Sequence, residues 1–264
     1  MLELYHNDMS SCAQKVRLTL AEKDLEWTSH HMNLRRGDTR TDEYLKLNPN
    51  GVVPTLIADG EVIIESTVIQ EYLDDTFLET PLKPKDSVAR ARMRLWTKQL
   101  DEGVHAALGS LSNGTAFRYQ TMAGRSEEEL KEHINRIPDP ARRERTMDLT
   151  LNGVDSSYFA PAAMRFVKLF SDMEVVLQSN TWLAGDEYTL ADIAFTPYVT
   201  RFDHLQYLGI LDNLPRLSDW YERIKARPNY QTGINDWLNE KYLLLMAEKG
   251  KEAWPRVKEI ISGS

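Results

Sequence analysis

Short apolar runs of strand length alternate with amphipathic segments over the first 78 residues of the chain. Helical spacing of apolar residues marks the amphipathic segments, and turn residues such as Asp59-Gly60 separate the runs. The pattern predicts strands over 2–5, 26–32, 52–57 and 62–64, and helices over 16–21, 41–47 and 66–77. This order of strand, helix, strand, helix, two strands and a final helix indicates one compact α/β domain.

The rest of the chain shows only helical periodicity, so we expect a second domain that is entirely α-helical. The proline-bearing segment 79–86 separates the two, which gives predicted domains of 1–78 and 87–264. Ser126 and Glu129 have the spacing of a capping box and predict a helix start. Other helices are predicted over 87–111, 158–178, 189–205 and 214–226, while the tail from Gly250 shows no clear pattern.

Composition narrows the possible partners. The net charge is -8, from 40 acidic and 32 basic residues, which argues against binding nucleic acid or anionic lipid. No apolar run reaches the roughly 18 to 20 residues that span a bilayer, and the start lacks the features of a signal peptide. We therefore expect a cytoplasmic protein without a membrane segment.

Cysteine and histidine usage argues against metal and disulfide chemistry. Cys12 is the only cysteine of the chain, so no intrachain disulfide can form and a cysteine-rich zinc site is excluded. The six histidines show no spacing typical of a metal site. We therefore expect no bound metal.

The triplet Ser10-Ser11-Cys12 lies where the first predicted strand ends and the first predicted helix begins. Backbone N–H groups and the helix dipole converge at such a position, so they stabilise a bound thiolate, and a serine hydroxyl adds a hydrogen bond. An alternative is that Ser10 or Ser11 only caps the helix. Cys12 is either a reactive nucleophile or a small apolar residue packed under the turn.

Two further pairs carry candidate chemistry. Val53-Pro54 stands at the head of a predicted strand, and a proline at this place is unusual. The alternative is an ordinary proline that starts the strand. Glu65-Ser66 stands at the start of a predicted helix, where it can receive a carboxylate or serve as an ordinary N-cap.

The order and spacing of these residues resemble the glutathione-site motifs of soluble glutathione transferases. The resemblance covers the whole N-terminal domain and continues at Thr189 to Ala194, which is similar to the family's N-capping box and hydrophobic staple. It rests on Ser10-Ser11-Cys12 with Lys15-Val16-Arg17, on Asn48-Pro49 with Gly51 and Val53-Pro54-Thr55-Leu56, and on Glu65-Ser66 with Ile69 and Tyr72-Leu73.

The resemblance implies a thioredoxin-like N-terminal domain, glutathione as co-substrate and a homodimer. It implies that the cis peptide bond before Pro54 exposes the main chain of Val53, which holds the cysteinyl part of glutathione, and that Glu65 with Ser66 holds the γ-glutamyl end. The thiol would lie against Ser10 or Ser11, with Cys12 beside them. Many members carry Lys or Gln at the position of Val52, so Arg35 or Arg36 is expected to supply the missing contact.

Two subgroups of the family compete. The Ser-Ser-Cys triplet resembles the zeta-class maleylacetoacetate isomerases, whereas the segments 65–73, 92–98 and 132–135 are similar to the bacterial lignin β-etherases. We predict that a serine-stabilised glutathione thiolate attacks a small hydrophobic or aromatic electrophile, with β-aryl ether cleavage as first candidate. The alternatives are a glutathione-dependent cis-trans isomerase and a non-catalytic glutathione-fold binding module.

The second-substrate pocket is expected between the first turn and the start of the helical domain. Aromatic side chains there suit an apolar electrophile, although each can equally belong to a helix core. The candidate residues are His6, Trp96, His105, Phe117 and Tyr119.

Overall fold

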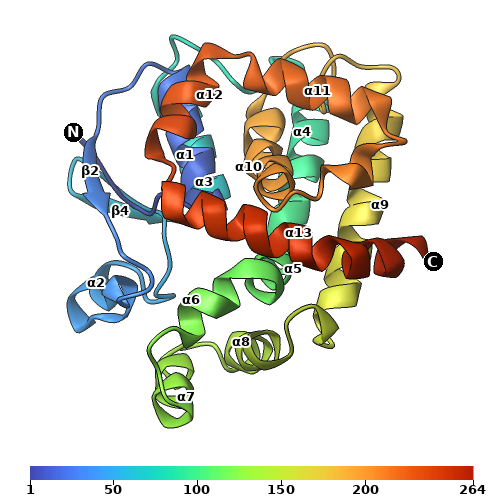
Figure 1. The fold of residues 1–264 in the computed structure, drawn as a ribbon. Coiled ribbons are helices and arrows are strands. Elements are labelled where there is room, and N and C mark those ends of the chain that lie inside the picture. The colour runs from blue at the N-terminus through green and yellow to red at the C-terminus, as the bar shows by residue number, and fades with distance from the viewer. Residues whose placement is uncertain (264) are drawn as a thin grey trace.

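The computed structural model describes residues 1–263 and has a four-stranded sheet at one side of a larger helical domain (Figure 1). The strands are β1 (Leu2–His6), β2 (Thr28–His31), β3 (Thr55–Ala58) and β4 (Glu61–Ile64), in the spatial order β2-β1-β3-β4. β1 is parallel to β2 and antiparallel to β3, and β3 is antiparallel to β4. The predicted order of an α/β domain followed by an all-helical domain is confirmed.

Three helices accompany the sheet: α1 (Ser11–Glu22), α2 (Asp42–Leu47) and α3 (Ser66–Thr76). The core of this domain is a cluster of fully buried apolar side chains from β1, β3, α1 and α3, including Leu4, Val16, Leu56 and Ile69. Since α1 and α3 each bury one apolar face against this cluster, their N-termini are held in fixed positions.

The helical domain is built around α10 (Leu190–His204), whose residues are buried from Leu190 to Phe202. The capping box predicted at Thr189 and Asp192 is confirmed, as is the one at Ser126 and Glu129. The other helices are α4 (Ser87–Gln99), α5 (His105–Ser112), α6 (Arg118–Met122), α7 (Glu127–Asn135), α8 (Pro140–Asn152), α9 (Phe159–Leu177), α11 (Pro215–Lys225), α12 (Pro228–Gly233) and α13 (Glu240–Ser262).

Two parts of this domain differ from the sequence prediction. The single helix expected over 87–111 is interrupted by a π-helical segment at Leu100–Val104, because Gly103 adopts a φ of 114° that only glycine accepts readily. Residues 250–262 of the tail without a clear pattern belong to the long helix α13, which begins at Glu240 and crosses the helical domain in Figure 1. The break at Gly103 resets the direction of the chain immediately before His105.

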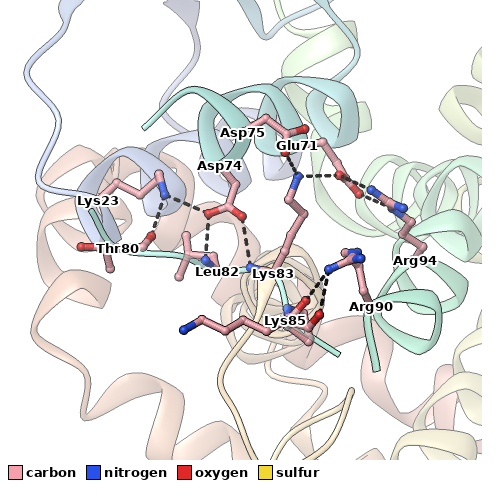
Figure 2. A network of polar contacts seen from close by, with 11 residues as sticks. Lys23, Glu71, Asp74, Asp75, Thr80, Leu82, Lys83, Lys85, Arg90 and Arg94 are labelled. Carbon is pink, nitrogen blue, oxygen red and sulfur yellow. Dashed lines mark hydrogen bonds and ion pairs between the residues drawn. The ribbon is translucent and has the colours of Figure 1, made fainter. Parts of the chain in front are cut away.

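A buried ion pair anchors the segment that joins the two domains (Figure 2). Lys23 of α1 and Asp74 of α3 lie 2.8 Å apart, with side chains only 1% and 3% exposed. The same carboxylate accepts hydrogen bonds from the main-chain N–H of Leu82 at 2.8 Å and of Lys83 at 3.1 Å. The Lys83 ammonium in turn pairs with Glu71 at 3.1 Å. Every group in the cluster is therefore satisfied, and the entry into α4 is fixed to α1 and α3.

Two buried arginines tie the sheet domain to the helical domain. Arg17 of α1 donates from Nε to the carbonyl of Gly233 at 3.1 Å and from Nη1 to the carbonyl of Asn7 at 2.9 Å. In the reverse direction, Arg201 of α10 donates from Nη2 to the carbonyl of Met9. Because these contacts flank the turn between β1 and α1, they set the position of that turn against the helical domain.

Candidate active site

The turn that precedes α1 carries the serine and cysteine triplet. Ser10 is the N-cap of α1, and its hydroxyl oxygen accepts a hydrogen bond from the Ala13 N–H at 3.3 Å. This contact leaves the hydroxyl hydrogen free to donate to a bound anion. Ser11 is buried as the first residue of the helix, and Cys12 follows it, half-buried. Capping and anion binding are therefore compatible roles for Ser10.

The Cys12 thiol faces a histidine from the other domain. Cys12 Sγ lies 3.4 Å from His105 Nδ1, and the same nitrogen lies 3.3 Å from the Tyr198 hydroxyl. Burial raises the pKa of the Cys12 thiol, but the charges of His105 and Lys15 and hydrogen bonds from His105 and Ser66 outweigh it and lower the pKa to about 6. At neutral pH the thiol is therefore largely a thiolate.

The Val53-Pro54 pair lies opposite this turn. Its peptide bond is cis, as the resemblance implied. The main-chain N–H and C=O of Val53 form no hydrogen bond with any residue from 1 to 263, although Val53 lies beside a cavity. Since unpaired main-chain groups need a partner, this position suits an extended peptide ligand.

Glu65 and Ser66 begin α3 on the same side. Glu65 has a φ of 68° and a ψ of 113°, an unfavourable conformation for a residue with a side chain, and its carboxylate accepts from Asn50 Nδ2 at 3.2 Å. Ser66 follows as the first helical residue and is buried. The N-terminus of α3 is therefore directed at the same space as that of α1.

These elements enclose a cavity of about 320 Å³, which we call the thiol cavity. The N-termini of α1 and α3 meet there, opposite the helical domain, so the cavity can stabilise an anionic sulfur. Its lining is Cys12, Val52, Val53, Pro54, Glu65, Ser66, His105, Ala106, Gly109, Asn113, Arg142, Arg145, Thr146 and Leu149.

A second cavity of about 260 Å³, which we call the arginine cavity, adjoins the first, since Val53, His105 and Arg142 line both. Ser10, Ser11 and Phe117 line it as well. It is named after its four arginines, Arg35, Arg40, Arg142 and Arg201, and no aspartate or glutamate within the described residues lines it.

The electrostatics of the arginine cavity reflect this imbalance. Burial and the positive charges of Arg40, Arg125, Arg136 and Arg35 lower the pKa of His133 to about 4. Burial and, to a lesser degree, Arg35 lower the pKa of Arg201 to about 10. Both shifts disfavour positive charge, which is the expected effect of buried cations without a counter-ion.

Three of the residues expected in the second-substrate pocket lie outside both cavities. His6 is fully buried between β2 and Arg17, with Nε2 2.8 Å from the Ser29 hydroxyl. Trp96 packs edge-on against a core phenylalanine, and Tyr119 is 40% exposed. None of these three side chains lines either of the two cavities described.

The other candidates are divided. His105 lines both cavities and Phe117 lines the arginine cavity, as does Arg35, whereas Arg36 is exposed and lines neither. Sequence reasoning missed Arg40, Arg142 and Arg201. A lone arginine carries no local signal in the sequence, because its neighbours in space come from other elements.

Neither a metal site nor a membrane helix is found in the part of the chain that the structure describes. Within residues 1–263, no three side chains of His, Cys, Asp or Glu are grouped to hold a metal ion. No helix in that range has the length and apolar character needed to cross a membrane.

Comparison with known proteins supports the motif-based reading. Residues 9–76 match the family model of the glutathione S-transferase N-terminal domain, and residues 131–223 match that of the C-terminal domain. Protein LigF of Sphingobium sp. (strain NBRC 103272 / SYK-6) is 32% identical over 245 residues, which cover 86% of this chain and 90% of that protein.

Solved structures and a second relative give the same result. The crystal structure of β-etherase LigF from Sphingobium sp. strain SYK-6 aligns with a TM-score of 0.80 at 30% identity, covering 89% of this chain and 99% of that one. Maleylacetoacetate isomerase of Dictyostelium discoideum is 44% identical over 93 residues, which are 34% of this chain and 42% of that protein.

Proposed function

Because this chain belongs to the glutathione transferase family, we propose that it binds glutathione in the thiol cavity and transfers the sulfur to an electrophilic carbon. Relatives that cover most of the chain are named as glutathione S-transferases, so the chain is an enzyme of this type and the reading as a non-catalytic module is set aside. What remains to propose is the placement of glutathione, its activation and the acceptor.

Glutathione is an extended tripeptide, and the cavity offers matching groups in sequence. The free main-chain N–H and C=O of Val53 would pair with the cysteinyl residue. The N-terminus of α3 at Glu65 and Ser66 would receive the γ-glutamyl end, whose carboxylate it stabilises and whose ammonium group faces the Glu65 carboxylate. The sulfur then lies near the N-terminus of α1.

The single observation that carries the proposal is the turn at Ser10 and Ser11. A hydroxyl that can donate, at a helix N-terminus and beside the unpaired main chain of Val53, is the arrangement that lowers the pKa of a bound thiol. We propose that one of these two serines donates a hydrogen bond to the glutathione thiolate. Cys12 would remain beside it as a group that helps to position the ligand.

We propose β-aryl ether cleavage as the first reaction to test, on the strength of the similarity to β-etherase LigF. The thiolate forms a carbon–sulfur bond as the carbon–oxygen bond breaks, and the phenolate leaves with the bonding electrons. His105 lines both cavities, so it can donate a hydrogen bond to the departing oxygen. Positioning of the two reactants supplies much of the remaining rate.

The test has two stages. Calorimetry with glutathione, together with the ultraviolet absorbance of the bound thiolate, measures binding and ionisation. Assays with a β-aryl ether model dimer, maleylacetoacetate and a chlorodinitrobenzene-type acceptor then identify the reaction. Release of phenol with formation of a glutathione thioether supports the proposal, whereas absence of glutathione binding contradicts it.

A zeta-like cis-trans isomerase is the second candidate. The 44% identity to maleylacetoacetate isomerase over 93 residues favours it, together with the Ser10-Ser11-Cys12 triplet. In this reaction the thiolate adds to the substrate and later leaves, so glutathione is not consumed. Fast isomerisation without any release of phenol from the ether would select this candidate.

We also propose a cytoplasmic homodimer. Apolar side chains are exposed on α3 and α4, namely Val68, Val88 and Leu95, and symmetric dimers are the commonest oligomers. Light scattering should give twice the monomer mass for the wild type, and Leu95→Glu should shift it toward the monomer. A monomeric wild type at micromolar concentration would contradict the dimer.

A further inference from the structure

The arginine cavity concentrates positive charge in a chain whose net charge is -8. Arg35, Arg40, Arg142 and Arg201 line it without a carboxylate from residues 1–263. Arginines buried near one another are normally paired with acidic side chains, because their desolvation is otherwise uncompensated. Asp8 and Asp139 act on Arg35 and Arg142 only from outside the lining, and this absence of a carboxylate from the described cavity wall is the observation from which the inference starts.

Arg35 and Arg142 are the two of the four whose side chains form no hydrogen bond or ion pair within residues 1–263, and of these two only Arg35 lines the arginine cavity alone. Its guanidinium carbon lies 4.8 Å from the centre of the Phe117 ring. No hydrogen bond or ion pair joins the Arg35 side chain to another residue within 1–263, although its main chain is bonded to Asn33 and Arg125. All of its N–H donors can therefore turn to a ligand.

Arg201 contributes a fixed donor close to the same phenylalanine ring. Its guanidinium carbon lies 5.1 Å from the centre of the Phe117 ring, and the residue is only 4% exposed. Nη1 donates to the Ser112 hydroxyl at 3.0 Å and Nη2 to the Met9 carbonyl, but Nε has no partner among the described residues. A buried N–H without an acceptor indicates that an acceptor is supplied from outside the chain.

The rest of the wall is apolar or neutral. Leu108, Ile134, Ile137 and Phe117 line the cavity, and His133 is uncharged near neutral pH because its pKa is about 4. An occupant with an apolar body and one anionic group would satisfy both kinds of wall.

We propose that the second substrate of this enzyme carries a carboxylate, which Arg35 and Arg201 bind beside Phe117. This inference rests on the proposed function, because it assigns the arginine cavity to the electrophile. Glutathione's own glycine carboxylate is the competing occupant. We assign that carboxylate to Arg142 and Arg145, which line the thiol cavity, whereas Arg35 and Arg201 line only the arginine cavity.

The experiment compares two ligands of nearly equal shape, 2-naphthoate and the neutral 2-naphthamide. Calorimetry measures the affinity of both, with and without saturating S-methylglutathione, which occupies the thiol cavity without reacting. Variants are Arg35→Gln, the charge-conserving Arg35→Lys, and Arg165→Gln as a control, since Arg165 is an exposed arginine of α9 outside both cavities.

The wild type should bind naphthoate about tenfold or more tightly than naphthamide, the equivalent of a charge-assisted hydrogen bond. Arg35→Gln should reduce that preference to about threefold or less, while Arg35→Lys and Arg165→Gln retain it. Affinity for S-methylglutathione should stay within about twofold in all variants.

Equal affinity of the wild type for naphthoate and naphthamide would overturn the inference. So would a preference that Arg35→Gln leaves unchanged, or a loss of S-methylglutathione affinity in Arg35→Gln, which would assign the arginine to glutathione. If the wild type bound naphthoate selectively but did not bind S-methylglutathione, the proposed function would fail and the carboxylate site would stand.

Discussion

The thiol cavity and the arginine cavity share a wall but differ in how their charged groups are compensated. In the thiol cavity, two helix N-termini, His105 and Lys15 act on the sulfur of Cys12, so an anion of this chain is stabilised in place. In the arginine cavity, Arg35 and Arg201 keep donors without a protein acceptor. One cavity is built around an anion that can form within it, and the other is built for an anion that arrives from solution.

The two cavities also differ in which segments of the chain line them. Three local motifs, each at the end of a strand or the start of a helix, supply the sheet-domain side of the thiol cavity, and residues of α5 and α8 supply the other side. The arginine cavity draws on a loop after β2, on η1 (Asp38–Arg40), and on the helices α5, α8 and α10, which are far apart in the sequence. The sheet-domain side of the thiol cavity can be predicted from local sequence, whereas the arginines of the other cavity come together only in the folded chain.

The largest expected effect concerns the buried ion pair that anchors the segment between the two domains, which both cavities require. Asp74→Ala would leave the Lys23 ammonium buried without its partner, which should cost about 3 to 5 kcal/mol of the free energy of unfolding. Urea denaturation measures the loss. The matched control is Asp75→Ala, whose side chain is 70% exposed, with an expected cost below about 1 kcal/mol. Equal losses for the two variants would show that the buried pair does not anchor the fold.

The second effect separates serine from cysteine chemistry at the N-terminus of α1, where Ser10 and Ser11 line the arginine cavity and Cys12 lines the adjoining thiol cavity. Replacing Ser10 and Ser11 together by alanine should raise the pKa of bound glutathione and lower kcat about 10²-fold, because the hydroxyl stabilises the thiolate. The naphthoate preference of the arginine cavity should remain. An active double variant beside an inactive Cys12→Ser would instead indicate a cysteine nucleophile that forms a mixed disulfide.

A third, smaller effect concerns the ionisation of Cys12. The rate of alkylation by iodoacetamide should rise with pH around a midpoint near 6, since the pKa of the thiol is about 6. His105→Asn removes a positive charge and a hydrogen bond, so the midpoint should move up toward the ordinary value of about 8.5. His133→Asn serves as the control because His133 does not contribute to this pKa. An unchanged midpoint in His105→Asn would rule out the histidine as its cause.

The smallest effect is an expected lack of pH dependence. The pKa of His133 is about 4, below its ordinary value, so the residue gains a proton only as the pH falls toward 4 and stays neutral above about 5.5. The contribution of His133 to the preference for naphthoate over naphthamide should therefore be constant between about pH 5.5 and 8, and His105, which also lines the cavity, is tested by repeating the measurement in His105→Asn. A preference that grows as the pH falls from 7 to 6 would show that a histidine charge contributes.

The sequence predicted those parts of the site that depend on local geometry. Ser10 is the N-cap of α1, Glu65 and Ser66 begin α3, and Thr189 with Asp192 forms the capping box of α10. Each of these roles is set by three or four consecutive residues. The break at Gly103 escaped prediction, since an isolated glycine is compatible with a continuous helix.

Contacts between elements could not be predicted in the same way. His105 was one candidate among several aromatic and histidine residues, and no spacing related it to Cys12, which is 93 positions away. The expected pocket role of His6 overlooked that the side chain of a strand residue can point into the core, where Ser29 and Arg17 bind it. Tertiary packing decided both cases.

The pairing of Cys12 with His105 makes the acidity of one thiol a measure of how the two domains are aligned. The sulfur comes from α1, the imidazole from α5 and the hydroxyl that contacts the imidazole from α10, so a shift of either domain would weaken the interaction. Loosening of the interface would appear first as a less reactive cysteine, before any loss of secondary structure. A chimera that received its helical domain from another family member would change nucleophile strength and acceptor preference in a single recombination event.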